Sequence, residues 1–136
     1  MAELAIPCLR YHDAPAAIEW LCRAFGFARH LVVPGGPGQI AHAELALGRA
    51  MIMLGSAGKG AGPLDELMST PRELAGRSTQ IVYLVVDDPD AHYEKALAAG
   101  AKVITPIEDK RQGGRGYLCS DPEGNLWSVG SYDPFA

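Results

Sequence analysis

The sequence predicts an α+β protein in which two βαβββ modules form a curved mixed sheet around a central cleft, with the helices outside. Three observations support this prediction. The order strand, helix, strand, strand, strand fits residues 1–55 and fits again over residues 79–136. Each helical segment is followed by a glycine stop signal, Gly26 or Gly100. A Gly-rich linker, residues 56–78, separates the modules, so we expect a single domain over residues 1–136.

The first module begins with the apolar segment Leu4–Tyr11, which is expected to form a strand. Asp13 is expected to cap a helix over Ala14–Phe25, because apolar residues recur there at helical spacing and Pro15 is tolerated in the first turn. Glycine- and proline-containing turns then separate three further strands, expected at Phe27–Val33, Ile40–Leu47 and Ala50–Leu54.

The segment Gly55–Ser78 differs in composition from both modules. It opens with a glycine-rich run, residues 55–63, and short helices are expected around residues 64–68 or 71–74. Two interpretations remain open: a linker alone, or a linker that also acts as a mobile flap. The run is long enough for the modules to pair within one chain or to exchange between subunits, and the sequence does not decide between these arrangements.

The second module repeats the pattern. A helix is expected from Asp88 to Ala99. Asp121-Pro122-Glu123-Gly124 predicts a hairpin turn, because proline fixes φ, aspartate accepts backbone hydrogen bonds and glycine permits positive φ. The four expected strands are Gln80–Val86, Ala101–Ile107, Gly116–Ser120 and Asn125–Ser131.

Composition excludes several classes of partner. The net charge of -4 gives no basic surface for nucleic acid, and no run approaches the ~18 apolar residues of a membrane span. The N-terminus lacks the basic and apolar regions of a signal peptide, so a cytoplasmic location is expected. The three cysteines, Cys8, Cys22 and Cys119, show no CxxC spacing and are expected to be buried, reduced thiols that pack as small hydrophobic residues, with a catalytic thiol as the open alternative.

Several motifs in order along the chain carry a resemblance to a known family. The motifs are Tyr11-x-Asp13-Ala14-x-x-Ala17-Ile18-x-Trp20-Leu21, Ala24-Phe25-Gly26-Phe27, Val86-Asp87-Asp88, Gly100-Ala101 and Asp121-Pro122-Glu123-Gly124-Asn125-Leu126-Trp127. With these motifs the chain resembles the vicinal oxygen chelate superfamily, of the glyoxalase/bleomycin resistance protein/dioxygenase type. The resemblance implies a homodimer and a cavity for a small molecule, completed by the partner or by paired modules.

In metal-dependent members, the resemblance implies four His, Glu or Gln ligands, one from the first and one from the last strand of each module. The first-strand position lies seven residues before the helix-capping Asp, and the last-strand position lies four residues after the turn glycine. These rules select Ile6, Ile52, Ile81 (Gln80 if the alignment slips by one residue) and Ser128. Because none of these offers the imidazole or carboxylate that divalent metals prefer, we expect no metal and no other cofactor.

Five residues are candidates for contact with a ligand. Arg10 shares a strand face with Ile6, where its guanidinium could pair a carboxylate, or else form a surface ion pair. Tyr83 shares a face with Ile81 and is either a ligand contact or a core tyrosine. The other three, near the predicted hairpin turn, are Arg115, Tyr117 and Ser128.

His42 and Glu44 lie two residues apart on one expected strand and therefore share a face. They are either a general acid–base pair, ligands of a displaced metal site, or residues of the surface or of a dimer contact. His12 and His92, at the helix entries, are expected to face solvent, and His30 has no identifiable partner.

These residues favour a metal-independent small-molecule binding protein, whose ligand would be a planar or partly hydrophobic molecule such as an antibiotic or secondary metabolite. The alternative is an enzyme (a lyase, isomerase or dioxygenase) that uses His42 and Glu44, either alone or together with a divalent metal. A third interpretation is a protein that acts through its dimer surface and has a vestigial cleft.

Overall fold

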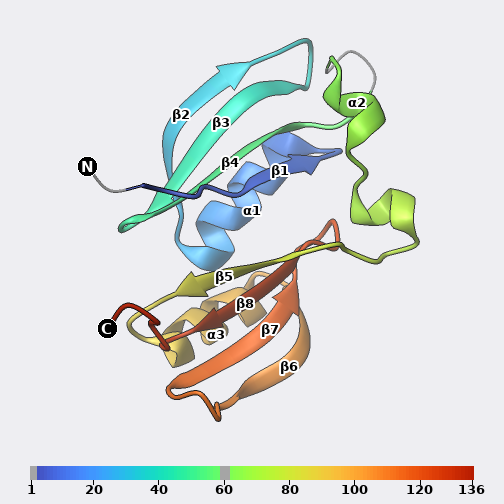
Figure 1. The fold of residues 1–136 in the computed structure, drawn as a ribbon. Coiled ribbons are helices and arrows are strands. Elements are labelled where there is room, and N and C mark those ends of the chain that lie inside the picture. The colour runs from blue at the N-terminus through green and yellow to red at the C-terminus, as the bar shows by residue number, and fades with distance from the viewer. Residues whose placement is uncertain (1–2, 59–61) are drawn as a thin grey trace. The chain divides into compact units, whose positions relative to one another are not determined.

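The structure is a computed structural model that describes residues 3–58 and 62–136. The chain divides into two compact units, each with one four-stranded sheet (Figure 1). The first unit comprises Met1–Cys22 and Gly26–Thr70, and the second comprises Arg23–Phe25 and Pro71–Ala136. None of the helices in the described ranges is both long enough and apolar enough to cross a membrane.

The first sheet has the strand order β1-β4-β3-β2. The outer strand β1 pairs with β4 in parallel, while β3 pairs with β4 and with β2 in antiparallel. The elements from the N-terminus to Leu67 are β1 (Cys8–Tyr11), α1 (Ala14–Phe25), β2 (Ala28–Pro34), β3 (Ile40–Leu47), β4 (Ala50–Ser56) and α2 (Leu64–Leu67).

The second sheet repeats this topology with the order β5-β8-β7-β6, and β5 and β8 are its parallel pair. The elements are the 3₁₀ helix η1 (Pro71–Leu74), β5 (Ile81–Val85), α3 (Pro89–Ala98), β6 (Lys102–Asp109), β7 (Arg115–Ser120) and β8 (Leu126–Gly130). The predicted α+β fold with two βαβββ modules is confirmed.

The predicted helix signals form in both modules. Asp13 Oδ1 accepts a hydrogen bond from the Ala16 amide at 3.1 Å, and Asp88 Oδ1 accepts one from the Ala91 amide at 3.0 Å. These carboxylates satisfy amides that the first helical turn leaves unpaired. Gly26 ends α1 with a φ of 87°, a left-handed conformation that glycine adopts without strain.

The predicted hairpin turn is built around the buried Asp121. Its Oδ1 accepts from the amides of Glu123 and Asn125, both at 3.0 Å, and its Oδ2 accepts from Trp127 Nε1 at 3.1 Å. Gly124 has a φ of 95°. The turn therefore sets the start of β8 at Leu126 and, with it, the orientation of Ser128.

Each sheet has one buried face and one open face, as expected from the alternation of strand side chains. In the first unit the buried strand residues are Leu9, Tyr11, Ala43, Leu45, Ile52 and Leu54. In the second the buried apolar strand side chains are Val82, Leu84, Tyr117, Cys119, Trp127 and Val129, and Gly116, Ser120 and Gly130 are buried as well. The apolar stripe of α1, including Ile18, Trp20 and Leu21, is also buried.

The largest boundary change is in the first strand. It begins at Cys8 rather than Leu4, because Pro7 has no amide to donate to the neighbouring strand and Leu4 is 82% exposed. The other strand boundaries shift by at most two residues, and α2 and η1 form within the Gly-rich linker, residues 56–78. Residues 59–61 of this linker lie outside the described residues.

Candidate functional site

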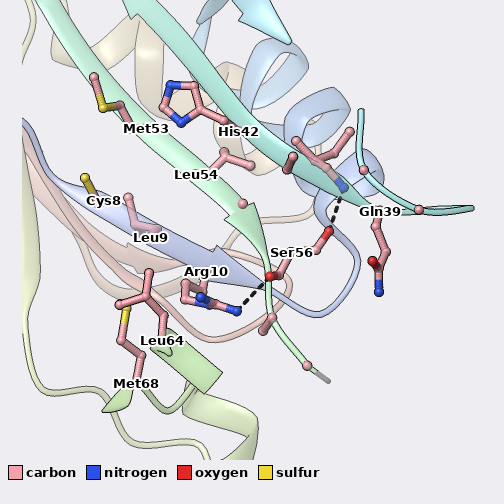
Figure 2. Close-up of a pocket in the computed structure, with 17 residues that line it drawn as sticks. Cys8, Leu9, Arg10, Gln39, His42, Met53, Leu54, Ser56, Leu64 and Met68 are labelled. Carbon is pink, nitrogen blue, oxygen red and sulfur yellow. Dashed lines mark hydrogen bonds between the residues drawn. The ribbon is translucent and has the colours of Figure 1, made fainter. Parts of the chain in front are cut away.

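A cavity of about 420 Å³ lies in the first unit, over the open face of its sheet (Figure 2). Strands β1, β3 and β4 contribute to its wall, together with Leu64 of α2 and Met68, which directly follows α2. The side chains that line it include Cys8, Arg10, Gln39, His42, Met53 and Leu64. The wall therefore combines apolar and sulfur-containing groups with a guanidinium and an imidazole.

Arg10 lines this cavity because β1 alternates: Leu9 and Tyr11 are buried in the core, and Arg10 lies on the opposite face. Its side chain is only 10% exposed. Nη2 donates to the Ser56 carbonyl oxygen at 2.9 Å, drawn in Figure 2, and to Asp65 Oδ1 at 3.0 Å. The sequence predicted that Arg10 could pair a carboxylate, and the carboxylate that it pairs belongs to the chain itself.

The predicted metal-ligand position Ile52 is wrong. Ile52 is 2% exposed and lies on the buried face, whereas its neighbour Met53 lines the cavity. The parallel register gives the reason: Met53 pairs with Cys8 as Ser128 pairs with Tyr83. The same number of residues separates Cys8 from cap Asp13 and Tyr83 from cap Asp88, so Met53 is the structural counterpart of Ser128.

Tyr83 and Ser128 are adjacent on the open face of the second sheet. Tyr83 is 41% exposed and is therefore not a core tyrosine. Its hydroxyl donates to the Tyr132 carbonyl oxygen at 2.6 Å. Burial is the main cause that raises the pKa of Tyr83, and the nearby Tyr132 and Asp133 raise it further, so the hydroxyl keeps its proton at neutral pH.

Arg115 lies in a surface ion-pair cluster of the second unit. Its Nε and Nη2 donate to the two carboxylate oxygens of Asp90, both at 3.1 Å, and Nη1 donates to Asp109 at 3.0 Å. The hydrogen bonds that Arg115 donates to Asp90 are the main cause that raises the pKa of the guanidinium. Arg115 does not line the cavity of the first unit, and a ligand role for it stays a prediction.

Tyr117 was predicted to contact a ligand, and this role stays a prediction. Tyr117 is 1% exposed, and its hydroxyl lies 2.6 Å from His92 Nδ1. Burial is the main cause that raises the pKa of Tyr117, and the nearby Cys119 and Tyr93 raise it further. The strand register explains the burial: Tyr117 pairs with the buried Val129, and Leu118 is the residue opposite Ser128.

His92 does not face solvent as predicted, because it is buried against Phe25 with ring centroids 5.2 Å apart. Its Nε2 lies 3.0 Å from the Phe25 carbonyl oxygen, which can only accept, so Nε2 carries the proton and neutral Nδ1 accepts from Tyr117. Burial lowers the pKa of His92. His12 is likewise only half-buried rather than free in solvent, with Nε2 2.7 Å from Thr70 Oγ1.

His42 and Glu44 lie on the same face, as predicted, and contact each other. His42 Nε2 lies 2.9 Å from Glu44 Oε2, and His30 Nε2 approaches the other carboxylate oxygen at 3.8 Å. His30 therefore has a neighbour that the sequence did not indicate; β2 is irregular between Arg29 and Leu31, and this irregularity was not visible in the pattern. His42 lines the cavity and Glu44 lies behind it on β3.

The residues present do not fit the metal that the resemblance implies. The open-face positions of the last strands carry the Met53 thioether and the Ser128 hydroxyl, and the first-strand positions carry Ile6 and Ile81. These groups are not the imidazole and carboxylate set of a divalent site. Within residues 3–58 and 62–136, no group of three or more His, Cys, Asp or Glu side chains is arranged to hold a metal ion.

Comparison with known proteins extends over nearly the whole chain. Residues 4–129 match the model of the Glyoxalase/Bleomycin resistance protein/Dioxygenase superfamily. An uncharacterized protein of Mycobacterium bovis is 35% identical over 128 residues, which cover 91% of this chain and 80% of that protein. An uncharacterized protein of Mycobacterium tuberculosis is also 35% identical over 128 residues, covering 91% of this chain and 71% of the relative.

Two solved structures show the same fold. TioX from Micromonospora sp. ML1 is 33% identical, with a TM-score of 0.73 and coverage of 95% of this chain and 98% of TioX. The fosfomycin resistance protein FosX from Listeria monocytogenes, crystallised with Mn(II) and 1S,2S-dihydroxypropylphosphonic acid, is 13% identical. Its TM-score is 0.68, with coverage of 98% and 93%, and at this identity the likeness shows the fold alone.

Proposed function

We propose, since this chain belongs to the Glyoxalase/Bleomycin resistance protein/Dioxygenase superfamily, that it is a metal-independent protein that binds a small organic molecule. The observation that carries this proposal is the cavity of about 420 Å³ over the first sheet. Its size falls within the roughly 300–1,000 Å³ typical of ligand sites, and its lining has the usual mixture of apolar groups with a few polar ones.

The lining favours a planar or partly hydrophobic ligand. Met53, Leu64 and Met68 offer adaptable apolar contacts, because thioethers are flexible and polarizable. Arg10 and His42 supply the polar contacts that would orient the molecule. Antibiotics and aromatic secondary metabolites have this chemistry and are the classes to test first. Ser128 and Tyr83 remain proposed contacts on the open face of the second sheet.

A matched pair of substitutions tests the cavity. Met53→Trp would fill it, whereas Met51→Trp changes another methionine of β4 that does not line it. A library of antibiotics and planar metabolites is screened by thermal shift and hits are measured by calorimetry. Met53→Trp should abolish binding, and Met51→Trp should retain it. Equal affinity of both variants and the parent would place the ligand elsewhere and refute the proposal.

Metal independence is tested on the purified protein. We expect no stoichiometric metal by elemental analysis and an unchanged Tm in the presence of EDTA. The reason is that the positions that carry metal ligands in metal-dependent relatives are Ile6, Met53, Ile81 and Ser128 here, which offer neither imidazole nor carboxylate. One tightly bound Zn, Ni, Mn or Fe per chain would contradict this part of the proposal.

A second candidate function is an enzyme, a lyase, isomerase or dioxygenase, and the contact of 2.9 Å between His42 and Glu44 favours it. A carboxylate that is hydrogen-bonded to one imidazole nitrogen holds the ring in a fixed orientation, as in general acid–base pairs. A divalent metal would be an addition to this pair. If His42→Ala and Glu44→Ala leave both ligand affinity and any turnover of hits unchanged, this candidate is removed.

We also propose that the protein is a cytoplasmic homodimer. Exposed apolar side chains on edge strand β2, Leu31, Val32 and Val33, and on β5, Ile81 and Val85, would gain from a partner surface. Light scattering coupled to size exclusion should give twice the chain mass of 14.4 kDa, and a monomer across the micromolar range would refute the dimer. Cell fractionation tests the location.

A further inference from the structure

Arg10 contributes a guanidinium to the cavity wall, and little of its side chain is exposed to solvent. Its side chain is 10% exposed, and a cation so far removed from water requires partners that replace the lost hydration. Its hydrogen bonds to Ser56 and Asp65 both use Nη2. For Nε and Nη1, no residue in the described ranges provides a hydrogen-bond partner, and neither atom is fully enclosed. The guanidinium therefore keeps donors that a molecule in the cavity can use.

The anion that now neutralises Arg10 is held on a weakly anchored element. Asp65 belongs to α2, a single turn without a buried residue and without a side-chain cap. Leu67 of this turn is 78% exposed and Leu64 is 45% exposed. Elements with few buried contacts open at low free-energy cost. The Arg10–Asp65 ion pair therefore joins a weakly anchored turn to strand β1.

A ligand oxyanion could offer Arg10 more than Asp65 does. Asp65 accepts through one oxygen from one guanidinium nitrogen. Carboxylate, sulfonate and phosphonate groups present two or more oxygens, which match the parallel N–H donors of a guanidinium in a bidentate arrangement. Such a group entering from the cavity would also face His42, a second potential donor on the same wall.

We propose that Arg10 is the binding site for an anionic group of the ligand, and that Asp65 is an internal counter-ion that this group displaces. This inference rests on the proposed small-molecule function and specifies its ligand class: a planar, largely apolar molecule with one carboxylate, sulfonate or phosphonate. Release of Asp65 from Arg10 would loosen this link between α2 and the sheet, so binding would be coupled to movement of the cavity wall.

Two fluorescent probes with the same aromatic skeleton test this proposal. 8-Anilinonaphthalene-1-sulfonate carries a sulfonate, and N-phenyl-1-naphthylamine is its uncharged counterpart. Asp65→Asn removes the competing charge and keeps the side-chain shape. It should therefore raise the affinity for the sulfonate probe by roughly fivefold to tenfold and leave the affinity for the neutral probe unchanged. Arg10→Met should lower the affinity for the sulfonate probe by about tenfold, with little effect on the affinity for the neutral probe.

The double variant Arg10→Met/Asp65→Asn completes a cycle. If Asp65 acts by competing for Arg10, Asp65→Asn should have no effect on the sulfonate probe once Arg10 is absent. If the pair only fastens α2, both probes should respond equally to each substitution, which overturns the inference and leaves the proposed function standing. Binding of either probe that Met53→Trp does not reduce would instead overturn the cavity assignment, and the inference with it.

Discussion

Trp127 Nε1 donates a hydrogen bond of 3.1 Å to Asp121 Oδ2, which joins the buried face of β8 to the turn before it. The other oxygen of the same carboxylate accepts from two turn amides. Asp121 is 4% exposed and Trp127 is fully buried. One side chain thus satisfies three donors and fixes which residues of β8 face the core.

Replacing the buried Asp121 should be among the most destabilising turn substitutions in the chain. Asp121→Ala removes three charge-assisted hydrogen bonds and leaves the buried indole N–H without its acceptor, so we expect a loss of about 3 kcal/mol in the free energy of unfolding. Urea denaturation measures it. The control is Asp87→Ala, an exposed aspartate near the start of α3, expected to change stability by at most about 0.5 kcal/mol. Equal losses in the two variants would refute the role of Asp121.

Stability should fall as the pH is lowered below the ordinary His pKa, because of His92. Burial lowers the pKa of folded His92, so between that value and about 6.5 the unfolded state binds the proton and the folded state does not. The free energy of unfolding therefore decreases with acidification, by at most about 1.4 kcal/mol per pH unit for one proton.

His92→Gln separates this contribution from those of the other titrating groups. Glutamine cannot be protonated, so the difference in unfolding free energy between parent and variant should shrink as the pH falls from 7 to 5. A difference that stays constant over this range would exclude His92 as the source of the pH dependence.

The cysteines should differ sharply in reactivity. Cys8, expected to be buried, is exposed and lines the cavity, whereas Cys119 is buried. Burial is the main cause that raises the pKa of Cys119 to about 12, and the charge of Asp121 adds to it. Because the thiolate is the reactive form, Ellman's reagent should modify Cys8 rapidly and Cys119 only upon unfolding. The fast phase should vanish in Cys8→Ser and persist in Cys119→Ser. A cavity ligand should slow it; a fast phase insensitive to Cys8→Ser would contradict the assignment.

Tyr83→Phe should cost little stability, about 1 kcal/mol or less, because it removes one neutral hydrogen bond to the Tyr132 carbonyl on a partly exposed face. The deleted contact should appear as faster amide exchange in the C-terminal residues near Tyr132. A loss of ligand affinity in this variant without such a change would assign the hydroxyl to the ligand.

Local signals in the sequence predict most of the fold. The caps Asp13 and Asp88, the helix stop at Gly26 and the turn at Asp121 each act within a few residues, so their chemistry can be read directly. The first strand was placed too early because its apolar composition extends through Leu4, while the missing amide of Pro7 decides where regular pairing starts.

The site was harder to predict, because it depends on strand register. Counting from the turn glycine worked for Ser128 and failed for Ile52, since the turn at Gly48 joins paired Leu47 and Ala50 directly, whereas the Asp121 turn spans from Ser120 to Leu126. A shift of one residue exchanges the two faces of a strand. Asp65, the partner of Arg10, comes from a segment with no periodic pattern, so the sequence offered no sign of their contact.

In each unit the first and last strands are neighbours, because β1 pairs in parallel with β4 and β5 pairs in parallel with β8. Contacts so distant in sequence carry a loop-closure entropy cost that contacts between neighbouring residues avoid, and they slow folding. On the ribosome, β1 therefore has no strand partner until β4 has been synthesised, and a chain released before Met51 would expose the edge to which β1 belongs.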